Sequence, residues 1–269
     1  MRVIYVAFGS AEVLAQTAIS LLSLARAEGK WPPRQAVRIY TDRPDFFSAF
    51  AGHAEIATID AGEMARWIAA ADGYRNIVKC HLLARQESSF VFLDSDTLVV
   101  RPFAELETEL RPSVAFFQNQ EYRLGARESC ARLVAAKEPG CDASTWMYNS
   151  GLLAVHGKDI AALRGAPELA VKFRRDYGIG PAEQLADAVL LAQKAEIRTA
   201  GKWIVHYWQD KVFFREFVGR VQAGRSWADW LRTEWGGADD PFRQLGLRMN
   251  PRAFAVLMKV QELCERFKT

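Results

Sequence analysis

Phe90-Val91-Phe92-Leu93-Asp94-Ser95-Asp96 is the stretch that decides the fold. Four consecutive apolar residues that end in a polar turn are typical of a strand buried on both faces of a parallel sheet. Because alternate residues of an extended segment point the same way, Asp94 and Asp96 can face one point beyond this strand. Two ionised carboxylates held that close repel each other unless a cation lies between them. The stretch therefore predicts a buried strand that ends at a site for a hard divalent ion.

Two other interpretations of this Asp-x-Asp pattern stay open. The pattern is common, and its simplest form is a pair of turn or cap residues with solvated charges. The apolar strand before it favours the metal site over this interpretation. Haloacid-dehalogenase-like phosphatases also carry such a pair, and their first Asp, here Asp94, is a nucleophile. Those chains usually place the pair on their first strand and have Thr or Val where this sequence has Leu98. Phosphohydrolysis is therefore the lower-ranked alternative.

The residues before the acidic pair alternate between strand and helix signals. Apolar runs predict strands at 3–8, 37–41 and 55–59, and helical spacing predicts helices at 11–28, from 44 onward and at 77–85. Strands and helices that alternate at this spacing imply a parallel sheet with helices on both faces. Such sheets bind ligands at the carboxyl ends of their strands, which is where the acidic pair lies.

The residues after the acidic pair continue the pattern less regularly. Strands are predicted at 113–117, 152–156 and 203–205, and helices at 159–176 and 181–195. The polar residues 118–145 predict an irregular, mobile excursion over the site. Beyond residue 211 the pattern indicates helices only.

Composition excludes several classes of protein. Half of the 269 residues are hydrophobic and a quarter are charged, as in an ordinary globular protein. The formal net charge of +3 is too small to indicate nucleic-acid binding. The apolar runs are far shorter than the roughly 20 residues of a membrane-spanning helix, and the N-terminus lacks the pattern of a signal peptide. We therefore expect a cytoplasmic protein.

Three further segments follow the acidic pair in a recognisable order. They are Tyr148-Asn149-Ser150-Gly151-Leu152-Leu153, Pro181-Ala182-Glu183-Gln184 and His206-Tyr207-Trp208-Gln209-Asp210-Lys211. With the acidic pair, they make the chain resemble the GT-A glycosyltransferases, most closely the retaining family-eight type. The resemblance implies a Rossmann-like, mostly parallel sheet and a hexosyltransferase activity. The enzyme would move a sugar from a nucleotide-diphosphate donor, with uridine diphosphate as the expected carrier, to a glycan or lipid-linked acceptor.

The resemblance also implies a ligand set for the ion. Asp96, His206 and Asp94, the last directly or through water, would hold it. Ligation by oxygen with one imidazole suits Mn²⁺ or Mg²⁺ better than zinc. Lys211 would meet the diphosphate, although a surface lysine at a helix end is the alternative. Lys79, on the helix that precedes the acidic strand, and Arg75, a turn earlier, could reach donor phosphate or lie in solvent.

The donor sugar would lie near the other two segments. By resemblance, Asn149 hydrogen-bonds a sugar hydroxyl and Gly151 allows a close backbone approach. A double displacement would need a carboxylate nucleophile beneath the sugar, and the matching position holds Gln184, whose amide is a poor nucleophile. Glu183 is its neighbour, but adjacent residues of a helix do not share a face. We therefore expect front-face attack with retention, the leaving phosphate helping to deprotonate the acceptor.

The sequence departs from the family pattern at three places. Gly9-Ser10 stands after the first strand, where the family has acidic or Asn residues; Glu183 replaces an Asp; and the segment from His206 to Lys211 is one residue shorter. A non-catalytic sugar-nucleotide binding protein on the same fold stays an alternative. A nucleotidyltransferase ranks lower, because no Gly-rich loop with Arg and Lys follows the first strand.

The C-terminal part has a different character. Residues 202–269 carry 12 basic and 8 acidic residues, and helices are predicted at 213–221 and 252–268 with Trp227, Trp230 and Trp235 between them. We expect a catalytic domain at 1–211 and a basic helical extension at 212–269. The extension either makes peripheral contact with the inner face of an anionic membrane or packs its aromatic rings onto the catalytic domain, and we favour packing.

Overall fold

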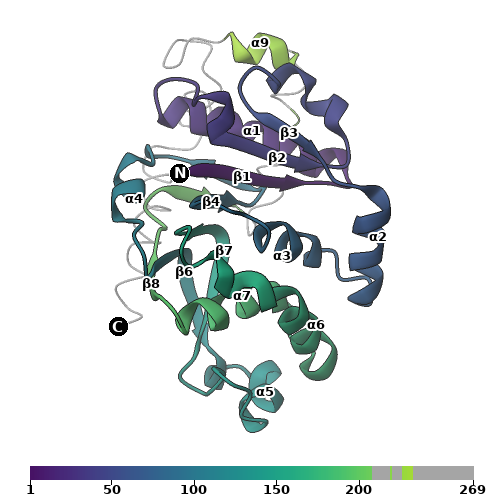
Figure 1. Ribbon diagram of the computed structural model, residues 1–269, viewed down its shortest axis with the longest axis vertical. Helices are drawn as coiled ribbons and strands as arrows, with labels where there is room; N and C mark the ends of the chain where they lie inside the picture. Colours follow the sequence, from purple (N-terminus) through teal and green to yellow (C-terminus); the bar gives the residue numbers. More distant parts are fainter. Residues whose placement is uncertain (208–218, 220–225, 233–269) are drawn as a thin grey trace.

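The computed structural model describes residues 1–207, 219 and 226–232 (Figure 1). The strands are β1 (Arg2–Ala7), β2 (Val37–Thr41), β3 (Glu55–Thr58), β4 (Phe90–Leu93), β5 (Thr97–Val99), β6 (Val114–Arg123), β7 (Trp146–Val155), β8 (Glu196–Thr199) and β9 (Ile204–His206). The α-helices are α1 (Ala11–Ala27), α2 (Ala61–Ala70), α3 (Ile77–Leu83), α4 (Ala104–Glu109), α5 (Ala131–Ala135), α6 (Ala166–Tyr177), α7 (Ala182–Ala192) and α9 (Trp227–Leu231). Short 3₁₀ helices include η2 (Pro44–Phe50) and η5 (Ile160–Gly165).

A seven-stranded sheet in the order β3-β2-β1-β4-β7-β6-β8 forms the centre of the molecule. All of its neighbouring pairs are parallel except those of β7, which is antiparallel to both β4 and β6. The expected mostly parallel sheet with helices on both faces is thus confirmed (Figure 1).

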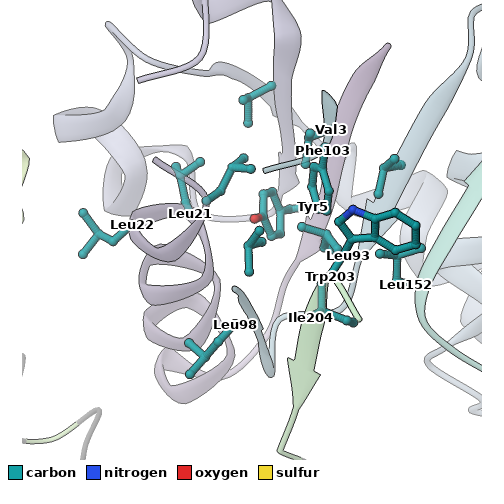
Figure 2. Close-up of a cluster of buried hydrophobic side chains, with 14 of the residues drawn as sticks. Val3, Tyr5, Leu21, Leu22, Leu93, Leu98, Phe103, Leu152, Trp203 and Ile204 are labelled. Atoms are coloured by element: carbon teal, nitrogen blue, oxygen red, sulfur yellow. The ribbon is translucent and has the colours of Figure 1, made fainter. Parts of the chain in front are cut away.

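The apolar run of β4 is explained by two hydrophobic cores, one on each face of the sheet. Val91 and Leu93 pack in the core shared with α1, and Phe90 and Phe92 pack in the core shared with α7. Figure 2 shows part of the first core, where Tyr5, Leu93 and Trp203 lie close together. Because both faces are covered, every position of β4 is buried and apolar as far as Leu93, and Asp94 is the first residue after the strand.

The order in which successive strands are placed in the sheet reverses at β1. The chain runs from β1 to β2 and β3 on one side, and then returns to place β4 on the other side of β1. Ligands of such sheets bind outside the carboxyl ends of the strands at this switch point. Asp94, directly after β4, therefore lies at the expected position of a ligand site.

Residues 118–145 differ from the expectation of an irregular, mobile excursion. Their first part continues β6 as far as Arg123, because it pairs with the start of β7 through two irregularities in register. The remainder is anchored to the helices behind it. Glu138 accepts hydrogen bonds from Lys172, at 2.7 Å, and from Tyr177, both on α6, and Gly140 packs against Val189 of α7.

Other helix and strand boundaries also differ from those predicted from the sequence. The helix expected at 159–176 is divided into η5 and α6, with Pro167 in the first turn of α6, where a proline is tolerated. The strand β5 and the helices α2 and α4 were not anticipated; β5 and α4 have only 3 and 6 residues.

Part of the predicted extension packs on the sheet domain. Helix α9 contacts η2, and the Trp227 ring lies 6.1 Å from Phe46 and 6.0 Å from Phe50, measured between centroids. This favours the packing interpretation for α9. The helices predicted at 213–221 and 252–268 lie outside the described residues, apart from Gly219. Among the described helices, none is both long and apolar enough to cross a membrane.

Candidate metal centre

Asp94, Asp96 and His206 come together as the sequence predicts. One potential ligand atom from each lies within 4.8 Å of the others, and His206 Nε2 is 3.0 Å from Asp96 Oδ1. Backbone hydrogen bonds hold all three. The Asp94 N–H donates to the Gly151 carbonyl at 2.9 Å, and the Tyr207 N–H donates to the Asp96 carbonyl at 3.1 Å. In the antiparallel β5–β9 ladder, His206 pairs with Thr97, which fixes it beside Asp96.

The donor set suits a hard divalent ion. Two carboxylates and one imidazole offer oxygen and nitrogen ligands, and leave coordination positions for other oxygen donors. Burial raises the pKa of Asp94, and the Asp96 carboxylate raises it further, whereas Lys79 and His206 lower it. A cation between the carboxylates would relieve that repulsion.

Lys79 is buried in the site rather than solvated. Its Nζ lies 3.0 Å from Ser150 Oγ, 3.5 Å from Glu183 Oε1 and 3.7 Å from Asp94 Oδ1. Burial alone would lower the pKa of the Lys79 ammonium, but the carboxylates of Asp94 and Glu183 outweigh burial and raise it. Lys79 therefore stays charged and links the end of β4 to the start of α7.

Arg75 lies apart from Lys79, at the end of β1. Its guanidinium is 5.2 Å from the centre of the Phe8 ring, and a Cβ built on Gly9 would lie 2.3 Å from its Nη2. The Gly9 N–H donates to the Asp42 carboxylate at 3.1 Å and 3.2 Å. The GT-A pattern has acidic or Asn residues directly after the first strand. Here Asp42, which follows β2, supplies a carboxylate to that loop instead.

Glu183 and Gln184 point to different partners. The buried Glu183 carboxylate accepts hydrogen bonds from Tyr74 and, at 3.1 Å, from Asn76, in addition to the contact with Lys79. Gln184 Oε1 instead accepts the Ser150 N–H of β7 at 2.7 Å. The amide nitrogen of Gln184 has no hydrogen-bond partner within residues 1–207.

Asn149 and Gly151 lie next to His206, in the middle of β7 rather than in a turn before it. Asn149 Oδ1 is 3.1 Å from His206 Nδ1. A Cβ built on Gly151 would lie 2.4 Å from both His206 Nδ1 and Gln118 Oε1. The groups that approach the Gly151 backbone closely are therefore the side chains of His206 and Gln118. Lys211 lies outside the described residues.

Sequence reasoning missed several residues of the site. Gln118 is the first polar residue after the apolar residues 114–117, and this was the only local signal of its role. Asp187 follows Glu183 by one helical turn, so the two share a face of α7. Asp187 is fully buried, and its carboxylate has no hydrogen-bond partner among the described residues. Burial raises the pKa of Asp187 to about 7, against the opposing effect of Lys79.

The Gly151→Ala substitution should displace His206. Since the new methyl group would overlap the imidazole, we expect the affinity for Mn²⁺ to fall about tenfold or more, with a loss of about 1–3 kcal/mol in the free energy of unfolding. Electron paramagnetic resonance of free Mn²⁺ measures the affinity. Gly52→Ala is the matched control, because nothing lies within 4 Å of the added carbon. Unchanged Mn²⁺ affinity in Gly151→Ala would exclude His206 as a ligand in this position.

Comparison with known proteins supports the fold. No family model and no curated protein matches the sequence. Among solved structures, the galactosyltransferase LgtC in complex with donor and acceptor sugar analogues superposes with a TM-score of 0.50 at 15% identity, covering 74% of this chain and 73% of that one. Mouse xyloside xylosyltransferase 1 in its apo form has a TM-score of 0.48 at 10% identity, covering 74% and 84%. The likeness to the first of these shows that the chain has the GT-A fold.

Proposed function

We propose that the chain is a metal-dependent glycosyltransferase. It would move a sugar from a nucleotide-diphosphate donor, with uridine diphosphate as the expected carrier, to a glycan or lipid-linked acceptor. The observation that carries the proposal is the convergence of Asp94, Asp96 and His206 at the switch point of a GT-A sheet. The superposed galactosyltransferase was solved with donor and acceptor sugar analogues, which supports the same class of ligands.

The electrostatics of the site favour a divalent cation. The carboxyl groups of Asp94, Glu183 and Asp187 surround Lys79, and Asp96 adds another beside Asp94. Asp94, Asp96 and His206 would hold Mn²⁺ or Mg²⁺. When bound, the ion would act as a Lewis acid on the donor diphosphate and stabilise the charge left as the sugar bond breaks.

The contacts of Glu183 favour front-face attack. A nucleophilic carboxylate needs a free oxygen beneath the sugar, whereas Glu183 is held by Tyr74, Asn76 and Lys79. The Gln184 amide is a poor nucleophile, and its oxygen is held by Ser150. Its amide nitrogen, which has no partner among the described residues, is suited to hydrogen-bond the donor sugar. We therefore propose retention, with the leaving phosphate taking the acceptor proton. A glycosyl adduct on Glu183, found by intact-protein mass spectrometry, would overturn this mechanism.

A metal-dependent rise in thermal stability with one nucleotide diphosphate is expected. A ligand that binds only the folded state at 100 times its Kd adds about 2.7 kcal/mol to the free energy of unfolding, or a rise of roughly 5–10 °C in Tm for a domain of this size. The measurement is a thermal-shift screen of nucleotides and sugar nucleotides with and without Mn²⁺.

The Asp96→Ala variant should lose this shift, and Asp176→Ala should keep it, because Asp176 pairs with Arg175 on the surface. Failure of every nucleotide to produce a metal-dependent shift would rule out the proposed donor site. Binding without sugar transfer or donor hydrolysis would instead favour the non-catalytic sugar-nucleotide binder, and phosphate trapped on Asp94 would favour the phosphohydrolase.

A further inference from the structure

The His206 imidazole has a defined environment on both of its nitrogens. Nε2 faces Asp96, as described above. Nδ1 faces two amide oxygens, Gln118 Oε1 at 2.9 Å and Asn149 Oδ1 at 3.1 Å. Gln118 and Asn149 are only 3% and 4% exposed. Because water is excluded there, the hydrogen bond that Nδ1 makes must be with these side chains.

The orientation of the Asn149 amide follows from its other partners. Its oxygen also accepts the Gly151 N–H at 2.8 Å, and its nitrogen donates to Glu121 Oε1 at 2.8 Å. Turning the amide over would place its NH₂ group against the Gly151 N–H and its oxygen against the Glu121 carboxylate. Both contacts would then be repulsive, so Oδ1 is the atom that faces His206.

The proton of a neutral His206 is therefore assigned to Nδ1. A neutral imidazole has one N–H donor and one acceptor nitrogen, and an amide oxygen can only accept. With the proton on Nδ1, the lone pair of Nε2 points to Asp96 and is available to an ion. Gly151 completes the arrangement, because any side chain there would occupy the space of the imidazole.

We infer that Gln118 and Asn149 are positioning residues that fix the orientation and tautomer of His206 for metal binding. The inference rests on the proposed function, since it presumes that His206 is a metal ligand. The amide of Asn149 is engaged by Gly151, His206 and Glu121, so it acts through His206 rather than on a sugar hydroxyl. Loss of such a partner of a metal-bound histidine typically costs 10–100-fold in affinity.

Gln118→Met tests the inference, because it keeps the length of the side chain and removes the acceptor oxygen. We expect its Mn²⁺ affinity, measured by electron paramagnetic resonance, to fall about 10–100-fold. Gln118→Glu restores an oxygen at the same place and should bind Mn²⁺ at least as tightly as the wild type. Wild-type affinity in Gln118→Met would overturn the inference alone. Absence of Mn²⁺ binding in the wild type would overturn the proposed metal site, and the inference with it.

A spectroscopic measurement on the wild type reads the tautomer directly, without comparing metal affinities between variants. The chain has 4 histidines, and ¹⁵N-histidine labelling of the Mg²⁺-loaded protein resolves which ring nitrogen of each carries the proton. His206→Gln assigns the signal. A proton on Nδ1 of His206 is the expected result, and a proton on Nε2 would contradict the inference.

Discussion

In Asp96→Ala, we expect sugar transfer to fall about a thousandfold or more and Mn²⁺ binding to be lost. Asp96 lies within 4.8 Å of both other ligands, and its Oδ1 is 3.0 Å from His206 Nε2. Its removal leaves one carboxylate and one imidazole, too few to hold a divalent ion against water. A bound ion supplies several kcal/mol of stabilisation to the charge that develops on a leaving group, and each 1.36 kcal/mol is a factor of ten in rate.

Ser95→Ala is the matched control for this prediction. Ser95 lies between the two acidic residues, but its hydroxyl accepts a hydrogen bond from Thr17 Oγ1 of α1 at 2.8 Å. We expect transfer within a few-fold of the wild type and unchanged Mn²⁺ affinity. Both variants would be assayed for kcat/KM with the nucleotide sugar found in the thermal-shift screen. Full activity in Asp96→Ala would show that metal bound at this place has no part in the reaction.

Lys79→Met should lower the free energy of unfolding by about 3–5 kcal/mol. The side chains of Lys79 and Glu183 are 8% and 4% exposed, so the ammonium is the counter-charge of a buried carboxylate. Met replaces the length of the side chain without the charge, and Glu183 and Asp94 then lose the cation between them. Urea denaturation followed by circular dichroism measures the change as a lower midpoint.

Two variants separate the charge effect from the general effect of substitution. Lys172 also makes a 2.7 Å ion pair, with Glu138, but it is 42% exposed. Lys172→Met should therefore cost at most about 1 kcal/mol. Adding Glu183→Gln to Lys79→Met should recover part of the loss, because it removes the unpaired charge. Equal destabilisation by Lys79→Met and Lys172→Met would show that the buried cluster is not held by charge.

The parts of the fold that could be predicted from the sequence are those that local pattern determines. Strand β4 and helix α1 were predicted because burial imposes a continuous apolar run on one and a helical period on the other. Strand β6 was predicted only as far as Phe117, since its continuation to Arg123 is polar and depends on pairing with β7. Strand β5 has only three residues, and its partner β9 lies about a hundred residues later in the chain.

The residues of the candidate site also divide into those that local pattern predicts and those that depend on distant contacts. Asp94 and Asp96 could be found because they follow one strand at alternate positions. His206 and Gln184 were found by resemblance to a family, since nothing local distinguishes them. The roles of Lys79 and Gln118 could not be derived, because each depends on contacts between residues far apart in the sequence. Gln118 and His206 are 88 residues apart, and Lys79 and Glu183 are 104 apart. Lysine is also rarely buried, so its usual place in solvent was an equal alternative for Lys79.

The β5–β9 ladder bears on the order in which a newly synthesised chain matures. Asp96 and His206 are separated by 110 residues, so at the usual rate of about 5–20 residues per second His206 is added roughly 5–20 s after Asp96. During that interval the ribosome-bound chain contains both acidic residues and Lys79, but not the imidazole. Lys79 is already present to neutralise Asp94, whereas binding of an ion as proposed would wait until β9 pairs with β5. The proposed metal centre would therefore be completed only after β9 has formed, because a chain that stops short of His206 lacks one of the three ligands.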